Sequence, residues 1–263
     1  MFKLALDAGH GKNTAGKRCM KALDKNETRE WVLNDRICDK IEKLLAEYDG
    51  ISVKRVDDTS GKTDVALSTR TKTANSFKAD LYLSIHHNAG INGGTGGGLI
   101  VIRQKGLSAD GETGKIQKKF YNALVKAGVP KGNRATPTPA QDLQVLRETT
   151  MPAILIECGF MDSATDIKYI LTDEFADKVA KECVNVIVEL GKLTKKRTET
   201  PTVQEKEPEA DKLADPKNEV TPEEPKPEAN TDQSVPAKKS WVEVVKEVLK
   251  VILEWLKLVD TNK

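Results

Sequence analysis

Short runs of apolar and β-branched residues alternate with longer stretches of helical periodicity along most of the chain. The short runs are predicted strands, at residues 2–6, 51–56, 81–86, 98–102, 143–146 and 153–157. Helical periodicity is found near residues 27–48, 66–78, 111–127 and 173–193. Alternating strands and helices favour a mostly parallel, twisted sheet with helices on both faces. We therefore predict one α/β domain over residues 1–195.

The composition changes after this domain. Residues 198–240 hold seven of the eleven prolines and eleven acidic side chains, with almost nothing apolar. Such a segment buries too little apolar surface to offset the entropy lost on ordering, so we predict a disordered linker over residues 196–239.

The last segment, residues 240–263, has the pattern of a short amphipathic helix. Apolar residues recur there at alternating spacings of four and three: Trp241, Val245, Val248, Ile252, Trp255 and Val259. Further apolar residues widen this face, so the helix must bury itself against something. We expect homo-oligomerisation or docking on its own domain, with contact to a membrane surface or wall component as the alternative.

Charge assigns no partner by itself. The chain has a formal net charge of +2, and because the linker is acidic the first 197 residues carry a positive balance. A mildly cationic domain is attracted to a polyanion such as nucleic acid or an anionic cell wall, but ordinary surface charge explains the balance equally well. We predict no nucleic-acid partner.

The chain start and the cysteines bear on the compartment. Met1 leads straight into a predicted strand, without the basic and apolar segments of a signal peptide, so we expect synthesis in the cytoplasm and action elsewhere only after release. No stretch has the roughly 18 uncharged apolar residues of a membrane span. The cysteines form no CxxC pair, which favours buried free thiols: Cys19, Cys38, Cys158 and Cys183.

A glycine-rich turn follows the first predicted strand in "LALDAGHGKNTAGKR". Residues 11–17 spell GxxxxGK, as in a phosphate-binding loop. That loop requires Ser or Thr next, because the hydroxyl binds magnesium, and Arg18 occupies the position. A nucleotide-binding switch is therefore a distant alternative.

The three histidines of the chain all lie at predicted strand ends. His10 follows the first strand, and His86 and His87 end the strand of "DLYLSIHHNAG". A third strand, "AILIECGF", carries Glu157, an acid that is costly to bury unless it is paired or metal-bound. Ligand sites of open α/β sheets form beyond the carboxyl ends of strands. These residues therefore predict a catalytic zinc site, which needs three protein ligands and one open position. His10 and one of the two neighbours His86 and His87 would supply two of the ligands.

The third ligand should be a carboxylate near His10, and two candidates open the first helix. Glu27 fits a capping box with Asp24 as N-cap, which gives it a structural role. Glu30 lies on the inward helical stripe but is also explained as a solvated acid at a helix start. Spacing alone leaves the choice nearly even.

Four segments carry a resemblance: "LALDAGHG", "ETREWVLNDRI", "ALSTRTKTANSFKADLYLSIHHNA" and "VLRETTMPAILIECGF". In this order they resemble the motifs of the type-3 family of zinc-dependent N-acetylmuramoyl-L-alanine amidases. In that family the helix glutamate precedes Asn by four residues and Ile by seven, which matches Glu30. The second histidine follows Ser-Ile, which matches His86, whereas His87 stands where the family usually has alanine.

The resemblance implies one zinc ion held by His10, Glu30 and His86, with Glu157 as the catalytic residue. The substrate would be peptidoglycan, cleaved between N-acetylmuramic acid and the L-alanine of the stem peptide. Glu157 would take a proton from the attacking water and return it to the leaving amine.

Three further residues have two readings each. Asn88 would bind substrate or cap its strand. Arg70 would contact the stem peptide or pair with an acid. Asp7 would hold His10 through a hydrogen bond or form a turn.

One catalytic domain with a tail resembles a phage endolysin, and a bacterial autolysin or sporulation amidase is the alternative setting. Two other classes stay open. A metal hydrolase of another amide or ester would use the same ligands. A non-catalytic wall-binding protein would share the fold. Such a protein should lack one of the metal ligands or the catalytic acid, whereas this sequence has a suitable residue at all four positions.

Overall fold

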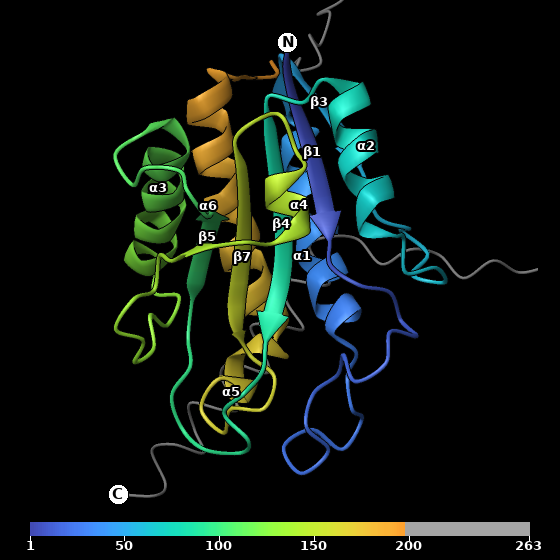
Figure 1. The fold of residues 1–263 in the computed structure, drawn as a ribbon, viewed down its shortest axis with the longest axis vertical. Helices are drawn as coiled ribbons and strands as arrows, with labels where there is room; N and C mark the ends of the chain where they lie inside the picture. The colour runs from blue at the N-terminus through green and yellow to red at the C-terminus, as the bar shows by residue number, and fades with distance from the viewer. Residues whose placement is uncertain (198–263) are drawn as a thin grey trace, which may run out of the picture. The chain divides into compact units, whose positions relative to one another are not determined.

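A computed structural model describes residues 1–197. The predicted C-terminal helix, and the predicted linker beyond residue 197, therefore lie outside the described residues. Six strands form one sheet in the order β3-β1-β4-β7-β5-β6 (Figure 1). Their bounds are β1 Phe2–Ala8, β3 Ile51–Arg55, β4 Leu81–Asn88, β5 Ile100–Gln104, β6 Ala140–Gln141 and β7 Ala153–Phe160.

The sheet is mostly parallel, as predicted. Strand β1 runs parallel to β3 and β4, and β4 runs parallel to β7. The exception is β5, which pairs antiparallel with β7 and parallel with β6. The carboxyl ends of β1, β4 and β7 consequently meet at one edge of the sheet.

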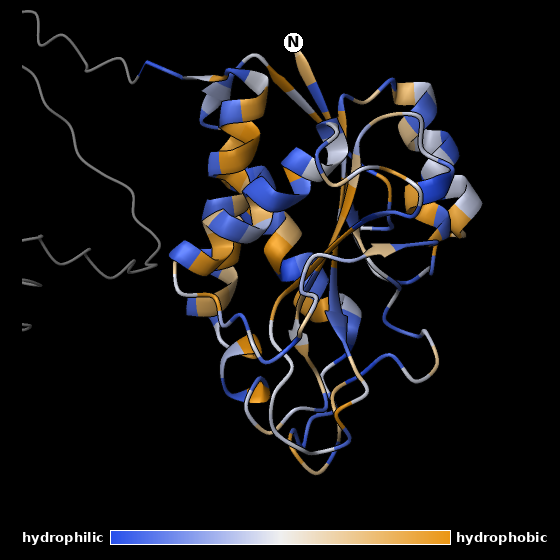
Figure 2. Ribbon diagram, turned by 60° about the vertical axis from the view of Figure 1, so that its left-hand side comes forward, coloured by the Kyte–Doolittle hydropathy of each residue, from blue (hydrophilic) through white to orange (hydrophobic). Residues whose placement is uncertain are grey.

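Helices cover both faces of the sheet, which confirms the predicted fold class. The helices are α1 Glu30–Leu45, α2 Leu67–Phe77, α3 Glu112–Lys126, α4 Gln144–Arg147, α5 Ile167–Ile170 and α6 Asp173–Gly191. One core lies under α1, α3 and α6, and a second lies under α2 and α4. Both faces of the central strands are buried: Tyr82 and Leu155 join the second core, while Leu83 and Ile156 join the first. Figure 2 shows the strands as mainly hydrophobic and the helices as two-sided.

The predicted strand at 143–146 is wrong. These residues enter the short helix α4, in which Leu146 N–H donates to the carbonyl of Leu143. A run of only four residues, three of them apolar, has no periodicity that separates a strand from a buried helical turn. The strand of this region is instead the two-residue β6, just before it.

The predicted capping box at the start of the first helix is also wrong. Helix α1 begins at Glu30 with Arg29 as N-cap, so the expected helix over 27–48 starts three residues too early. The Asp24 carboxylate instead accepts hydrogen bonds from the backbone of Asn26 and Thr28, which closes a turn. Glu27 has φ +46° and pairs with Arg18.

Smaller features complete the described part of the chain. Strands β2 (Tyr48–Asp49) and β8 (Thr194–Lys195) form an antiparallel pair. All four cysteines are buried and free, as expected. Among residues 1–197, no helix combines the length and apolar character required to cross a membrane.

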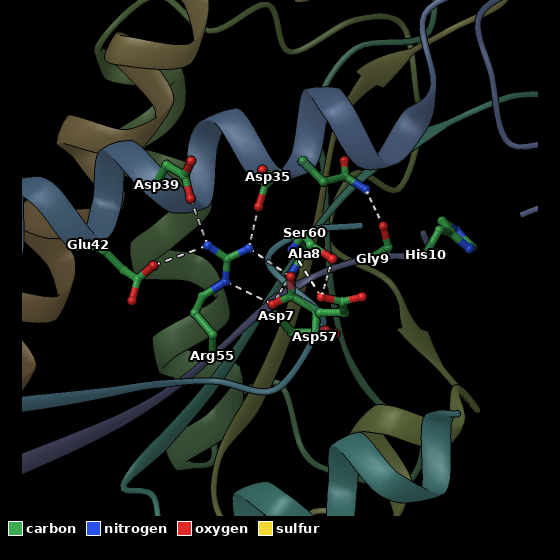
Figure 3. Close-up of polar contacts among 12 residues, drawn as sticks. Asp7, Ala8, Gly9, His10, Asp35, Asp39, Glu42, Arg55, Asp57 and Ser60 are labelled. Carbon is green, nitrogen blue, oxygen red and sulfur yellow. Dashed lines mark hydrogen bonds and ion pairs between the residues drawn. The ribbon is translucent and has the colours of Figure 1, made fainter. Parts of the chain in front are cut away.

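The end of β3 is held by one buried arginine. Arg55 contacts four carboxylates, drawn in Figure 3: Asp35, Asp39, Glu42 and Asp57. The Asp57 side chain is fully buried, and it also accepts a hydrogen bond from the backbone of Ala8, near the end of β1. The cluster therefore joins α1 and β3 to the strand end that precedes His10.

We predict that Arg55→Ala lowers the free energy of unfolding by about 3–5 kcal/mol, because it leaves the buried Asp57 carboxylate without its counter-charge. Urea unfolding would measure the change. The control is Arg147→Ala, which removes an exposed pair with Asp142 and should leave stability nearly unchanged. Equal effects of the two substitutions would contradict a structural role for the cluster.

The same cluster predicts a pH dependence. Burial raises the pKa of Asp35 to about 6, more than its hydrogen bond to Arg55 lowers it. The folded protein then binds more protons than the unfolded chain between about pH 4 and 6, so stability falls as the pH rises through that window. Asp35→Asn should flatten this fall in urea midpoints measured from pH 4 to 7. Asp39→Asn, on an exposed partner of Arg55, should retain it.

Candidate functional site

Residues from three neighbouring strands meet at the carboxyl edge of the sheet. His10 follows β1, His86 lies near the end of β4, and Glu157 lies on β7 directly opposite His86 in the strand register. Parallel neighbours lie about 4.8 Å apart, so this register places the two side chains side by side. The strand-end residues singled out in the sequence are therefore brought together.

Two histidines and one carboxylate form a compact group. Glu30 Oε1 lies 3.3 Å from His10 Nε2 and 3.0 Å from His86 Nδ1. The three ligand atoms all lie within 4.8 Å of one another. Ligands of a tetrahedral zinc ion lie about 3.3 Å apart, so two imidazole nitrogens and a carboxylate at these separations fit zinc in both chemistry and spacing.

Glu30 lies at this group because of its place on α1. Leu33, Ile37 and Glu30 share the buried stripe of the helix, so the carboxylate points towards the strands and its residue is only 1 % exposed. Burial opposes ionisation, but hydrogen bonds with His10 and His86 more than offset it and lower the pKa of Glu30. Glu27 is not part of the group and pairs with Arg18 instead, so Glu30 is the candidate ligand. Its burial also excludes the interpretation of Glu30 as a solvated acid at the helix start.

The turn that carries His10 requires glycine. A Cβ added to Gly9 would lie 2.0 Å from the His86 ring, because the two chain segments touch there. His10 itself adopts φ +69°, a left-handed conformation that is uncommon outside glycine. The His10 and His86 rings then meet edge to face, with centroids 5.0 Å apart.

Arg70 and Asp7 are a buried pair beneath this turn. Arg70 is 1 % exposed and donates to the Asp7 carboxylate and to the carbonyls of Ala8 and His10. Arg70 therefore forms the structural pair with an acid that was one of its two predicted roles. Its other predicted role, a direct contact with substrate, stays a prediction.

The expected hydrogen bond from Asp7 to the His10 side chain is absent among the described contacts. The Asp7 carboxylate accepts from Tyr82, Ser84 and Arg70 instead. Burial opposes its ionisation, but Arg70 and Ser84 hold the pKa of Asp7 below its ordinary value. Asp7 therefore positions His10 indirectly, through Arg70.

His87 faces the opposite side of β4 from His86. Its Nδ1 lies 2.8 Å from Asn34 Oδ1, and Asn34 Nδ2 donates to the carbonyl of Gly9. Burial lowers the pKa of His87 to about 3, so the ring is neutral at ordinary pH. His87 therefore joins α1, β4 and the His10 turn and lies outside the metal-ligand group.

Glu157 is suited to proton transfer. Burial raises its pKa to about 7, although the neighbouring His86 acts in the opposite direction. Its Oε2 atom is buried and makes no hydrogen bond to any described residue. A carboxylate with a pKa near neutrality and a free oxygen beside a metal-ligand group can take up and return a proton.

Asn88 ends β4 beside the site. Its side-chain oxygen accepts a hydrogen bond from the backbone of Ala89, and its carbonyl accepts one from Met161. This is the arrangement of a strand-end cap. Asn88 as a substrate-binding residue stays a prediction.

Lys17 is a site residue that sequence reasoning assigned to a different purpose. Its ammonium lies 3.7 Å from Glu30 Oε2, and its charge also acts on Glu157. The only signal in the sequence was the phosphate-loop pattern, which points to another chemistry. The contact depends on the folding of the 11–29 loop, where the backbone of Glu30 donates to the carbonyl of Lys17.

A metal-ligand group of two histidines and a glutamate, with a second glutamate beside it that can accept a proton, is the site of a hydrolase on this α/β fold. The comparison with known families agrees: the N-acetylmuramoyl-L-alanine amidase family matches residues 4–189. The chain belongs to this family.

Relatives of this chain come from a phage and from bacteria. The endolysin of Bacillus phage SPP1 is 34 % identical over 197 residues, which cover 74 % of this chain and 69 % of that protein. The amidase CwlM of Bacillus licheniformis is 34 % identical over 195 residues, covering 74 % and 71 %. A sporulation-specific amidase of Bacillus subtilis is 32 % identical, covering 74 % and 70 %.

Solved structures share the fold. An N-acetylmuramoyl-L-alanine amidase from Clostridium difficile 630 superposes with a TM-score of 0.63 at 27 % identity, covering 72 % of this chain and 95 % of that one. The catalytic domain of CwlV from Paenibacillus polymyxa gives 0.62 at 24 % identity, covering 72 % and 98 %. Both support the architecture described above.

We predict that Glu30→Ala lowers the zinc content of purified protein far more than Glu27→Ala, because only Glu30 lies within reach of both histidines. Metal analysis after dialysis against dilute zinc would measure it. The two glutamates are close in sequence, so the pair is its own control. Greater zinc loss from Glu27→Ala than from Glu30→Ala would show that Glu27 is the ligand.

Proposed function

We propose that this protein is a zinc-dependent peptidoglycan amidase that cleaves the bond between N-acetylmuramic acid and the L-alanine of the stem peptide. The observation that carries the proposal is the meeting of His10, Glu30 and His86 beside Glu157. The family match over residues 4–189 supports the choice of bond.

A zinc ion bound by the three ligands would lower the pKa of water and polarise the amide carbonyl. Glu157 accepts the proton of the water that attacks the carbonyl carbon. It then donates that proton to the amide nitrogen as the C–N bond breaks. The products are a lactyl carboxylic acid on the sugar, which loses its remaining proton to solvent, and a peptide with a free L-alanine amino terminus. Glu30, His10 and His86 would hold the metal, and Arg70 maintains the His10 turn by donating to the backbone carbonyl of His10.

For the biological setting, we propose a phage endolysin that reaches the wall after release from the cytoplasm. Similarity to the SPP1 endolysin supports this setting. The bacterial and sporulation amidases have similar identities and make an autolysin or sporulation enzyme the alternative. A non-catalytic wall-binding protein is disfavoured, because all three ligand positions and Glu157 are filled. Contact or self-association through residues 240–263 stays a prediction.

The decisive test is a digest of purified cell wall, with zinc and with a chelator. We expect new L-alanine amino termini, because hydrolysis of the proposed amide bond frees the amine of L-alanine. They should form only when zinc is present, because His10, Glu30 and His86 are a metal-binding set. New reducing sugar ends are assayed in parallel. Reducing ends alone would mean a glycosidase, and other amino termini would mean a peptidase.

We predict that Glu157→Gln loses at least about a thousandfold in turnover while keeping its zinc, because the amide cannot accept the proton. Metal content and the wall digest would be measured on the same preparation. Glu112→Gln is the comparison, since that glutamate is exposed at the start of α3 and lies outside the ligand group. Full turnover by Glu157→Gln would remove Glu157 from the reaction.

A further inference from the structure

The chain just before α1, residues 17–30, folds into a short hairpin. The Cys19 N–H donates to the carbonyl of Thr28, which joins its two arms. The Met20 N–H donates to the carbonyl of Met161, which ties the hairpin to the chain just after β7. Figure 1 shows this part of the chain in blue, below the arrowheads of β1 and β4. The hairpin therefore lies at the same edge of the sheet as the metal-ligand group.

The hairpin and the turn before it carry much of the positive charge of the described chain. Residues 1–197 hold 32 basic and 25 acidic side chains, and residues 11–29 hold six basic and two acidic ones. This one segment thus supplies four of the seven excess positive charges. The six basic residues are Lys12, Lys17, Arg18, Lys21, Lys25 and Arg29.

The two acids of this segment have partners within it. Asp24 is only 6 % exposed, and its carboxylate accepts hydrogen bonds from the backbone of Asn26 and Thr28. Glu27 pairs with Arg18. Neither carboxylate is left to neutralise the lysines of the hairpin tip.

The basic side chains of the hairpin are gathered rather than dispersed. Lys21 and Lys25 are exposed at the tip, and neither forms an ion pair with a residue of the described part of the chain. Arg18 and Arg29 lie directly opposite each other in an antiparallel bridge between the arms. Like charges placed opposite each other on paired strands repel. A bound polyanion would relieve that repulsion.

The acids of the adjoining loops are also engaged inside the protein. Asp162 and Asp166 are 8 % and 3 % exposed, and both accept hydrogen bonds from backbone N–H groups. Asp58 accepts from its own loop, and Asp64 pairs with Arg70. The lysines of the hairpin tip therefore face solvent beside acids that already have partners.

The kind of anion follows from what the segment lacks. Residues 11–29 contain no aromatic side chain, and Trp31, just beyond them, is only 4 % exposed. Proteins that bind single-stranded nucleic acid stack the bases on exposed aromatic rings. A polymer that carries phosphodiester charges without bases fits this surface better.

We propose that the basic hairpin, residues 17–30, binds a phosphodiester polymer of the bacterial cell wall, a chain of polyol phosphates. Such binding holds the metal-ligand edge of the domain against the wall that carries the polymer and raises the local concentration of substrate. The choice of the wall as the source of the polymer rests on the proposed amidase function. The hairpin adds a binding partner to that function.

The test compares two double variants of the zinc-loaded full chain. Lys21→Gln with Lys25→Gln removes the two exposed charges of the hairpin tip. Lys115→Gln with Lys181→Gln removes two exposed charges from α3 and α6, so it gives the same change in net charge. Zinc content and the urea midpoint should equal those of the wild type in both, because all four side chains are exposed.

The probe is soluble poly(glycerol phosphate), titrated into each protein by calorimetry at low and at moderate salt. We expect the tip variant to bind at least about tenfold more weakly at about 50 mM salt, because two cation–phosphate contacts are lost. The slope of log K against log salt should become shallower by about 0.7 for each lost contact. The α3 and α6 variant should bind like the wild type.

Each other outcome overturns a defined part of the proposal. Absence of binding by the wild type, or an equal loss in both double variants, would show that the hairpin is not a binding surface. Tighter binding of oligothymidylate with the same number of phosphates would make nucleic acid the partner in place of the wall polymer. The titration requires no cleavage, so binding of the polymer without any digestion of cell wall would contradict the amidase function alone.

Discussion

The buried ion pair between Arg70 and Asp7 is the interaction on which the site depends. Neither charge has solvent to stabilise it, so each requires the other together with the hydroxyls and carbonyls around them. Because Arg70 also holds the carbonyl of His10, helix α2 fixes the turn that follows β1. A second connection, from His87 through Asn34 to Gly9, holds the same turn from α1. His10 is thus positioned from both faces of the sheet.

With His10 held in place, the two carboxylates of the site have pKa values shifted in opposite directions. Glu30 is almost completely buried yet ionised, because two imidazoles contact its carboxylate. On β7, opposite His86 in the strand register, burial raises the pKa of Glu157 towards neutrality. Two carboxylates in one site are thereby given opposite tendencies, one to stay charged and bind a cation, the other to exchange a proton. That separation of roles is what metal-assisted amide hydrolysis requires.

Much of the site was predictable because strand ends are visible in the pattern of residues. Histidines at the ends of β1 and β4 and an acid within β7 follow from apolar runs and the rule that parallel strands present their carboxyl ends together. The choice between Glu30 and Glu27 was not predictable from spacing, because it depends on where α1 begins. A turn closed by Asp24 delays that start to Glu30. The strand predicted at residues 143–146 was wrong for a related reason, since a run of four residues with three apolar side chains fits a strand or a helical turn equally well.

The sequence by itself determined the class of fold, the residue types of the candidate site and their order along the chain, because periodicity and strand-end positions are local properties. The tertiary structure decided which polar groups are partners. Asp7 binds Arg70 rather than His10, and Lys17 approaches Glu30 rather than a phosphate. These pairings join residues that are distant in sequence, and burial makes them obligatory, because a charge removed from water must find a counter-charge within reach. No local pattern encodes which one it finds.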